Sequence, residues 1–176
     1  MPTLLITGTN RGLGLEFVRQ YSQAAWKVHA CCRDPGSAEA LLAIQRERPE
    51  LVKMHVLDMN DFTAIETLSN KLKNQSIDVL LSNAGVYGNH RQDIYDVDYQ
   101  NWSELFRVNT MAAMKLATAF VDQVSSSQLK KMVFISSKMG SQGDNISGGC
   151  YTYRSTKSAL NAVVKSLSVD LEYQDI

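Results

Sequence analysis

Short apolar runs alternate with helical patterns along the whole chain, and this alternation restricts the fold more than any other feature. The apolar runs predict strands, and the segments between them carry apolar residues at helical spacing. The first such segment, for example, places Phe17, Val18 and Tyr21 on one face. Strands are expected at 3–7, 27–32, 51–58, 77–85 and 130–137, and helices at 14–25, 37–47, 62–74, 98–125 and 153–173.

A regular succession of strand and helix predicts a parallel sheet covered by helices on both faces, which is an α/β fold. The sequence contains no internal repeat, low-complexity tract or linker. Its 176 residues are enough for one domain with a sizeable core. We therefore expect residues 1–176 to form a single domain.

Charge and composition narrow the possible partners and the compartment. Eighteen basic residues balance eighteen acidic ones, so no overall field favours nucleic acid or a membrane surface. The apolar runs are too short to span a bilayer, and the N-terminus does not resemble a secretion signal. The three cysteines are odd in number and lack a CxxC spacing, which predicts reduced thiols in a cytoplasmic protein. They are Cys31, Cys32 and Cys150.

The three histidines are scattered without the spacing of metal ligands, so no metal site is expected. They are His29, His55 and His90.

A glycine-rich turn follows the first predicted strand. Gly8, Gly12 and Gly14 fall within seven residues, directly before a helical pattern. Backbone N–H groups and the positive end of a helix dipole attract phosphate there, and glycine lets a pyrophosphate come close. The spacing differs from the common G-x-G-x-x-G, and a tight left-handed turn is the alternative. Its place after the first strand of an alternating α/β chain favours the phosphate site.

Residues 7–14, Thr-Gly-Thr-Asn-Arg-Gly-Leu-Gly, resemble the cofactor turn of the short-chain dehydrogenase/reductase family. Other motifs of that family follow in the same order, and residues 151–171 further resemble the sniffer-like carbonyl reductases. These motifs are Asp58-Met59, Asn83-Ala84-Gly85, Asn109, Ser136-Ser137 and Tyr153-x-x-x-Lys157. The resemblance implies a Rossmann-type, doubly wound sheet that binds NAD(P) and reduces a small-molecule carbonyl substrate to an alcohol.

The same resemblance assigns a role to each matching residue. The cofactor would contact Gly8, Asn10, Arg11, Gly12, Leu13, Gly14, Arg33, Asp58, Met59, Asn83, Ala84, Gly85, Tyr153 and Lys157. The catalytic residues would be Asn109, Ser137, Tyr153 and Lys157.

Tyr153 and Lys157 are four residues apart and so project from one helical face. A phenol is a weak acid with a pKa near about 10, and a nearby ammonium stabilises its ionised form. Tyr153 would then donate a proton to the carbonyl oxygen, while Lys157 would also bind the nicotinamide ribose. Tyr151 is a competing tyrosine, but Ser155 stands where it would need a lysine.

Two assignments keep an alternative. Ser137 would polarise the substrate carbonyl by resemblance, and Ser136 is its competitor. Sixteen residues separate Ser137 from Tyr153, a few more than usual in the family. Asn109 would hold a water that relays protons to Lys157, or would be a helix-interior residue with a satisfied side chain.

The end of the second strand predicts NADP rather than NAD. Enzymes that use NAD place an acid there to bind the ribose 2′-hydroxyl, but this chain has Cys32, followed by Arg33. Arg33 and Arg11 can bind the 2′-phosphate of NADP through charge-assisted hydrogen bonds. Asp34 lies two positions past the usual acid and is expected to cap the next helix instead.

Members of this family continue into a sixth strand, a substrate loop and a seventh strand, so the sheet is expected to stop before its sixth strand. By resemblance the helices at 98–125 and 153–173 would pack against a second subunit, which predicts a homo-oligomer. Two functions remain open: an NADP-dependent carbonyl reductase, and a non-catalytic form that binds a nucleotide or dimerises.

Overall fold

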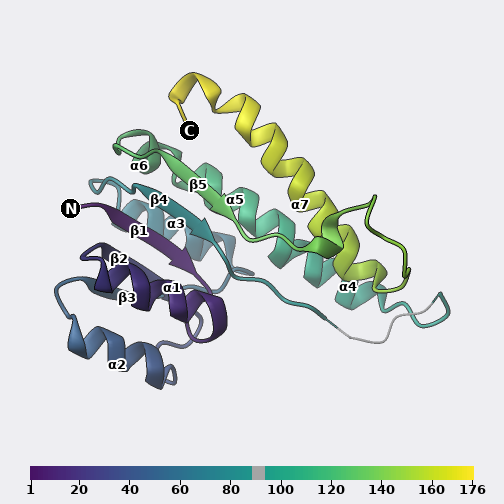
Figure 1. Ribbon diagram of the computed structural model, residues 1–176, viewed down its shortest axis with the longest axis horizontal. Helices are drawn as coiled ribbons and strands as arrows, with labels where there is room; N and C mark the ends of the chain where they lie inside the picture. Colours follow the sequence, from purple (N-terminus) through teal and green to yellow (C-terminus); the bar gives the residue numbers. More distant parts are fainter. Residues whose placement is uncertain (89–93) are drawn as a thin grey trace.

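The computed structural model describes residues 1–88 and 94–176, which form a five-stranded parallel sheet with helices on both faces (Figure 1). The strands are β1 (Thr3–Thr7), β2 (Lys27–Cys32), β3 (Val52–Val56), β4 (Val79–Ser82) and β5 (Lys131–Phe134). The α-helices are α1 (Gly12–Gln23), α2 (Glu39–Glu47), α3 (Phe62–Lys71), α4 (Tyr99–Phe106), α5 (Ala112–Ala119), α6 (Val121–Ser125) and α7 (Tyr151–Asp170). Short π and 3₁₀ segments cover Arg107–Met111, Lys138–Gly140 and Glu172–Gln174.

The strand order β3-β2-β1-β4-β5 confirms the doubly wound α/β fold. Strand β1 lies at the centre, where Leu5 is opposite His29 on β2 and Leu80 on β4. All five residues of β1 are buried, as expected for a strand covered on both faces. Strands β1 and β2 have the bounds that the sequence predicts, whereas the other three are shorter at both ends.

The helices divide into two layers. Helices α1 and α2 cover one face, where Val18 and Leu41 pack against Leu4, Ile6 and other strand residues. Helices α3 and α5 cover the other face. Helix α7 lies beside α5 near β5, where Leu167 and Leu171 contact Ala117 and Phe134. Figure 1 shows α7 as the long yellow-green helix running past β5 and α5. Every strand therefore ends at the same edge of the sheet.

The expectation of one helix over 98–125 is wrong in detail. Asp98 begins the helix as expected, since its carboxylate accepts a hydrogen bond from the Asn101 amide at 2.9 Å. A π turn over Arg107–Met111 then separates α4 from α5, and Phe120, with φ −112°, separates α5 from α6. A π turn inserts one extra residue into a helix and so changes which side chains face inward after it.

Helix α7 begins at Tyr151, two residues before the predicted start, and Cys150 precedes it in the left-handed conformation with φ 50°. No helix among the described residues is both long enough and apolar enough to cross a membrane. His90, one of the three histidines, lies outside the described residues.

Candidate functional site

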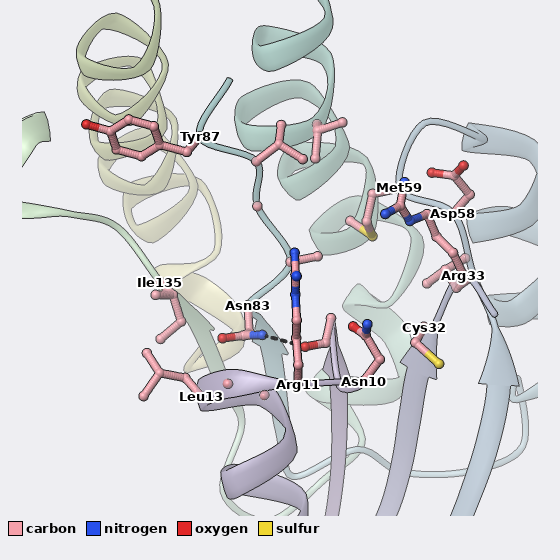
Figure 2. Close-up of a pocket in the computed structure, with 18 of the residues that line it drawn as sticks. Asn10, Arg11, Leu13, Cys32, Arg33, Asp58, Met59, Asn83, Tyr87 and Ile135 are labelled. Carbon is pink, nitrogen blue, oxygen red and sulfur yellow. Dashed lines mark hydrogen bonds between the residues drawn. The ribbon is translucent and has the colours of Figure 1, made fainter. Parts of the chain in front are cut away.

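A cavity of about 420 Å³ opens at the carboxyl ends of the strands (Figure 2). All fourteen residues that were expected to contact the cofactor line it, from Gly8 to Lys157. The sequence did not single out eight of its other neighbours as cofactor contacts, namely Cys32, Leu57, Asn60, Val86, Tyr87, Val108, Ile135 and Ser136. The cavity therefore joins the glycine turn after β1 to the Tyr-x-x-x-Lys face of α7.

The glycines of the turn are required by close contacts. A Cβ atom at Gly8, where φ is +71°, would lie 2.8 Å from the Cα of Ala84. A Cβ atom at Gly14 would overlap the carbonyl oxygen of Gly8. Only glycine fits at these two positions, and the helix can therefore start directly beside the strand end.

The turn is held in place by Thr7 and Asn83. The Thr7 hydroxyl accepts hydrogen bonds from the backbone amides of Asn83 and Ala84, at 3.1 and 3.0 Å. The Asn83 side-chain amide donates to the carbonyl oxygens of Thr7 and Gly8, at 2.9 and 3.1 Å. The Asn-Ala-Gly motif therefore supports the glycine turn from the neighbouring strand. Thr7 was not singled out from the sequence, although it is part of the glycine motif.

The first turn of α1 fits a phosphate. Arg11 is its N-cap residue, but no side chain caps the helix, and no acidic residue lies in its first turn. The unpaired N–H groups at such a helix end and the positive end of the dipole favour an anion. Figure 2 shows the Arg11 side chain rising through the middle of the pocket, with Arg33 near Asp58 at one side.

At the end of β2 the pocket contains no acid. Cys32 is 4% exposed and lines the cavity together with Arg33. Asp34 instead accepts a hydrogen bond from the Ser37 amide at 3.3 Å, and this contact lowers the pKa of its carboxyl group. The expectation that Asp34 caps α2 is wrong by position, because Ala38 is the N-cap residue and Asp34 stabilises the turn before it.

Lys157 is buried against Tyr153. Its side chain is 4% exposed, and burial lowers the pKa of its ammonium group. Its Nζ atom donates to the carbonyl oxygen of Ile135 at 2.8 Å and lies 5.9 Å from the centre of the Tyr153 ring. Tyr151 does not line the cavity. The geometry therefore pairs this lysine with Tyr153 rather than with its competitor.

Asn109 lies behind the cavity wall, in the π turn, and is 2% exposed. Its Oδ1 atom accepts from the Val86 amide at 2.9 Å, and its Nδ2 atom donates to the Val86 carbonyl at 2.8 Å. A third hydrogen bond of 3.1 Å joins Nδ2 to the Thr156 hydroxyl. The side chain is thus fully engaged and fastens the segment after β4 to α7.

The two serines after β5 have different hydrogen bonds. The Ser136 hydroxyl donates to Oδ1 of Asn161 at 2.7 Å, so its proton is already used. The Ser137 hydroxyl accepts from the Met139 amide at 3.1 Å, so its own proton remains free to donate. Ser136 lines the cavity and Ser137 lies next to it in sequence.

His29 and His55 are distant from this pocket in sequence motif and contact each other instead. Nδ1 of His29 lies 2.9 Å from Nε2 of His55, and Nε2 of His29 lies 3.1 Å from Oε1 of Gln75. Over residues 1–88 and 94–176, no three His, Cys, Asp or Glu side chains gather as a metal site would require.

Comparison with known proteins gives a family match over nearly the whole chain, since the model of the short chain dehydrogenase family matches residues 2–176. The chain is 37% identical over 95 residues to C-signal of Myxococcus xanthus, an alignment that covers 54% of this chain and 57% of that protein. It spans less than two thirds of the curated relatives that it matches first, at 57% and 66% of their length.

Among solved structures, the carbonyl reductase Sniffer of Drosophila melanogaster is similar with a TM-score of 0.92 and 32% identity. The match covers 100% of this chain and 77% of that one. A carbonyl reductase of Pseudomonas aeruginosa in complex with NADP has a TM-score of 0.86 and 29% identity, over 97% of this chain and 76% of that one.

Proposed function

This chain belongs to the short-chain dehydrogenase family, and we propose that it is an NADPH-dependent reductase that converts an aldehyde or ketone into an alcohol. One observation carries the proposal: a single cavity joins the glycine turn to the side chains of Tyr153 and Lys157. The similar structures with carbonyl reductase in their names support the reaction class. We infer that residues 1–176 act as one cofactor-binding domain.

The preference for NADPH follows from charge. Arg11 and Arg33 line the cavity, and Cys32 stands where an acid would repel the 2′-phosphate. The complex of the Pseudomonas aeruginosa relative with NADP supports this choice. The glycine turn and the uncapped start of α1 would hold the pyrophosphate.

Bound NADPH supplies a hydride to the carbonyl carbon, and the residues of this chain supply the proton and its path. Tyr153 donates its hydroxyl proton to the carbonyl oxygen, and the Lys157 ammonium stabilises the negative charge that develops on the phenol oxygen. Ser137 donates its free hydroxyl proton to the same carbonyl oxygen and so polarises it. Asn109 holds the cavity wall, and the proton path from Lys157 passes through a water beside it.

The same proposal includes the assembly and the compartment. Apolar side chains are exposed along the helices expected to contact a second subunit: Tyr99 (72%), Met111 (51%), Met114 (39%), Tyr151 (37%) and Val169 (55%). A homo-oligomer would cover them. The three free thiols fit the reducing cytoplasm.

The substitution Tyr153→Phe tests the reaction. It removes the proton donor and keeps the ring, so we expect NADPH oxidation with a reactive aldehyde to fall by about 10²–10⁴-fold, the range for general acid catalysis, with NADPH affinity unchanged. Tyr151→Phe is the matched control and should remain active. NADPH binding without turnover of any carbonyl would favour the alternative, a non-catalytic nucleotide-binding form. Activity that survives in Tyr153→Phe and disappears in Tyr151→Phe would refute the assignment.

A further inference from the structure

Tyr87 lies against the tyrosine that we assign as proton donor. The centres of the Tyr87 and Tyr153 rings are 4.4 Å apart, and the ring planes are tilted by 32°. Both residues line the cavity. Figure 2 shows the Tyr87 ring at the end of the pocket opposite Asn10 and Cys32, with its hydroxyl directed away from the pocket. One side of the Tyr153 ring is therefore already occupied by another aromatic ring.

The backbone around Tyr87 is fixed on both sides. The Asn109 side chain binds the amide and the carbonyl of Val86, as a neighbouring strand would. Gly88 has φ +77°, and a Cβ atom there would lie 2.8 Å from a methyl group of Leu105. Both neighbours of Tyr87 are thus held in place, and its Cα–Cβ bond has a defined direction.

The far end of the Tyr87 ring is held as well. Its hydroxyl lies 3.5 Å from the sulfur of Met139 and 3.7 Å from the sulfur of Cys150. The contact with Cys150 raises the pKa of Tyr87, so the hydroxyl keeps its proton and can donate it. Met139 follows β5 and Cys150 precedes α7, so the ring bridges two elements that border the site.

We propose that Tyr87 sets the size limit for the carbonyl substrate, so that aldehydes unbranched beside the carbonyl are accepted and branched ones are excluded. This inference rests on the proposed function. The carbonyl oxygen must come within about 3 Å of the Tyr153 hydroxyl, so the substituents on the carbonyl carbon lie beside the Tyr153 ring. The Tyr87 ring fills part of that space and cannot turn away without breaking its contacts at both ends.

The first measurement compares three aldehydes that differ only in branching: propanal, 2-methylpropanal and 2,2-dimethylpropanal. We expect kcat/KM of the wild type to fall by about tenfold or more with branching, in the range for steric mismatch in a pocket. Tyr87→Ala should reduce this ratio to near one, and Tyr87→Phe should keep it, because the phenyl ring fills the same space. Tyr173→Ala, which removes a tyrosine that is 80% exposed, is the control and should keep the wild-type ratio.

The second measurement needs no turnover and uses the alkylation of Cys150, detected by mass spectrometry. Cys31 and Cys32 are 1% and 4% exposed, and burial raises the pKa of both thiols, so they should stay unmodified. Iodoacetamide is a small reagent and N-phenylmaleimide a bulky one. If the Tyr87 ring blocks access to this end of the cavity, Tyr87→Ala should accelerate the bulky reagent about tenfold more than the small one.

The outcomes separate the two proposals. Equal kcat/KM for all three aldehydes in the wild type, or a ratio that Tyr87→Ala leaves unchanged, overturns the size limit while carbonyl reduction stands. If the wild type reduces no carbonyl, the proposed function fails, and the alkylation rates alone decide whether Tyr87 restricts access. Equal acceleration of both reagents then overturns the restriction. Should Tyr87→Ala fail to give a cooperative thermal melt, Tyr87→Val, which also lacks the ring, replaces it in both measurements.

Discussion

Arg33 is the residue on which the choice of cofactor should depend most. It lines the cavity at the end of β2, beside Cys32 and without an acid. A hydrogen bond to a charged group is worth about 1.5–3 kcal/mol, so Arg33→Ala should weaken NADPH binding by about 10–100-fold and NADH binding far less. Isothermal titration of both cofactors measures this. Arg19→Ala is the control, because Arg19 pairs with Glu16 outside the cavity. Equal losses for NADPH and NADH would rule the assignment out.

His29 and His55 give the fold a dependence on pH. An amide oxygen only accepts, so Nε2 of His29 donates to Gln75, and Nδ1 of His29 accepts the proton of His55. Burial lowers the pKa of both rings, that of His55 to about 4, with Lys53 and Lys71 adding positive charge nearby. Between pH 6.5 and about 4 the unfolded chain therefore binds more protons than the folded chain at His55.

The free energy of unfolding should accordingly decrease as the pH falls below about 6.5. From pH 7.5 to 5 we expect a loss of about 1 kcal/mol from this pair, allowing for partial solvent exposure. Urea denaturation at both pH values measures it. His55→Gln keeps a donor and cannot titrate, so the variant should lose less stability than the wild type over this range. The same loss in both proteins would show that the pair does not titrate as described.

At the scale of elements, the glycine turn and the start of α1 are packed too closely for any side chain. Gly14→Ala would place its methyl group on the carbonyl oxygen of Gly8. We expect a loss of about 2–4 kcal/mol in unfolding free energy, as for other overpacked sites, and weak NADPH binding. Gly143→Ala is the matched control, because a Cβ atom there meets nothing within 4 Å. Its stability should stay within about 0.5 kcal/mol of the wild type. Thermal melts and NADPH titration of both variants test the difference.

Much of the fold and of the pocket could be predicted from the sequence because the evidence is local. The alternation of apolar runs defines the strands, and the cofactor motifs are contiguous segments at strand ends. The π turn could not be predicted, since Arg107–Met111 has no residue that disfavours an ordinary helix. Only the contacts of Asn109 with Val86 and Thr156 give a reason for the extra residue.

Side chains that act across elements were also beyond the sequence. Tyr87 directly follows a motif that was recognised, yet its contact with Tyr153 depends on how β4 and α7 meet. The choice between Ser136 and Ser137 rested on resemblance, whereas their different hydrogen-bond partners now give it a physical reason.

At the scale of the whole molecule, β5 borders the sheet. Among the described residues it pairs with β4 alone, and Val133 is 40% exposed. An edge strand with an exposed apolar residue, together with the exposed residues of α4 and α7, favours self-association. Light scattering on residues 1–176 should therefore give a dimer or a larger species. A monomer that melts cooperatively would contradict this prediction.

NADPH should stabilise the same protein. At about 100 times its dissociation constant, a ligand adds about 2.7 kcal/mol, which corresponds to an increase in Tm of about 5–10 °C for a protein of this size. A thermal melt with and without NADPH measures the shift, and Gly14→Ala should show little of it. An unchanged Tm at saturating NADPH would argue against the cavity as the cofactor site.

The central position of β1 has a consequence for the order in which the protein is made. Strand β1 is the first element synthesised, but one of its two neighbours is β4, and the buried carboxylate of Asp78 accepts the Thr3 amide at 2.8 Å across 75 residues. A growing chain can pair β1 with β2 early, yet that edge of β1 stays open until the ribosome has released β4. Contacts between segments so far apart form slowly. The emerging half-sheet is therefore the stage at which this protein has most need of a chaperone.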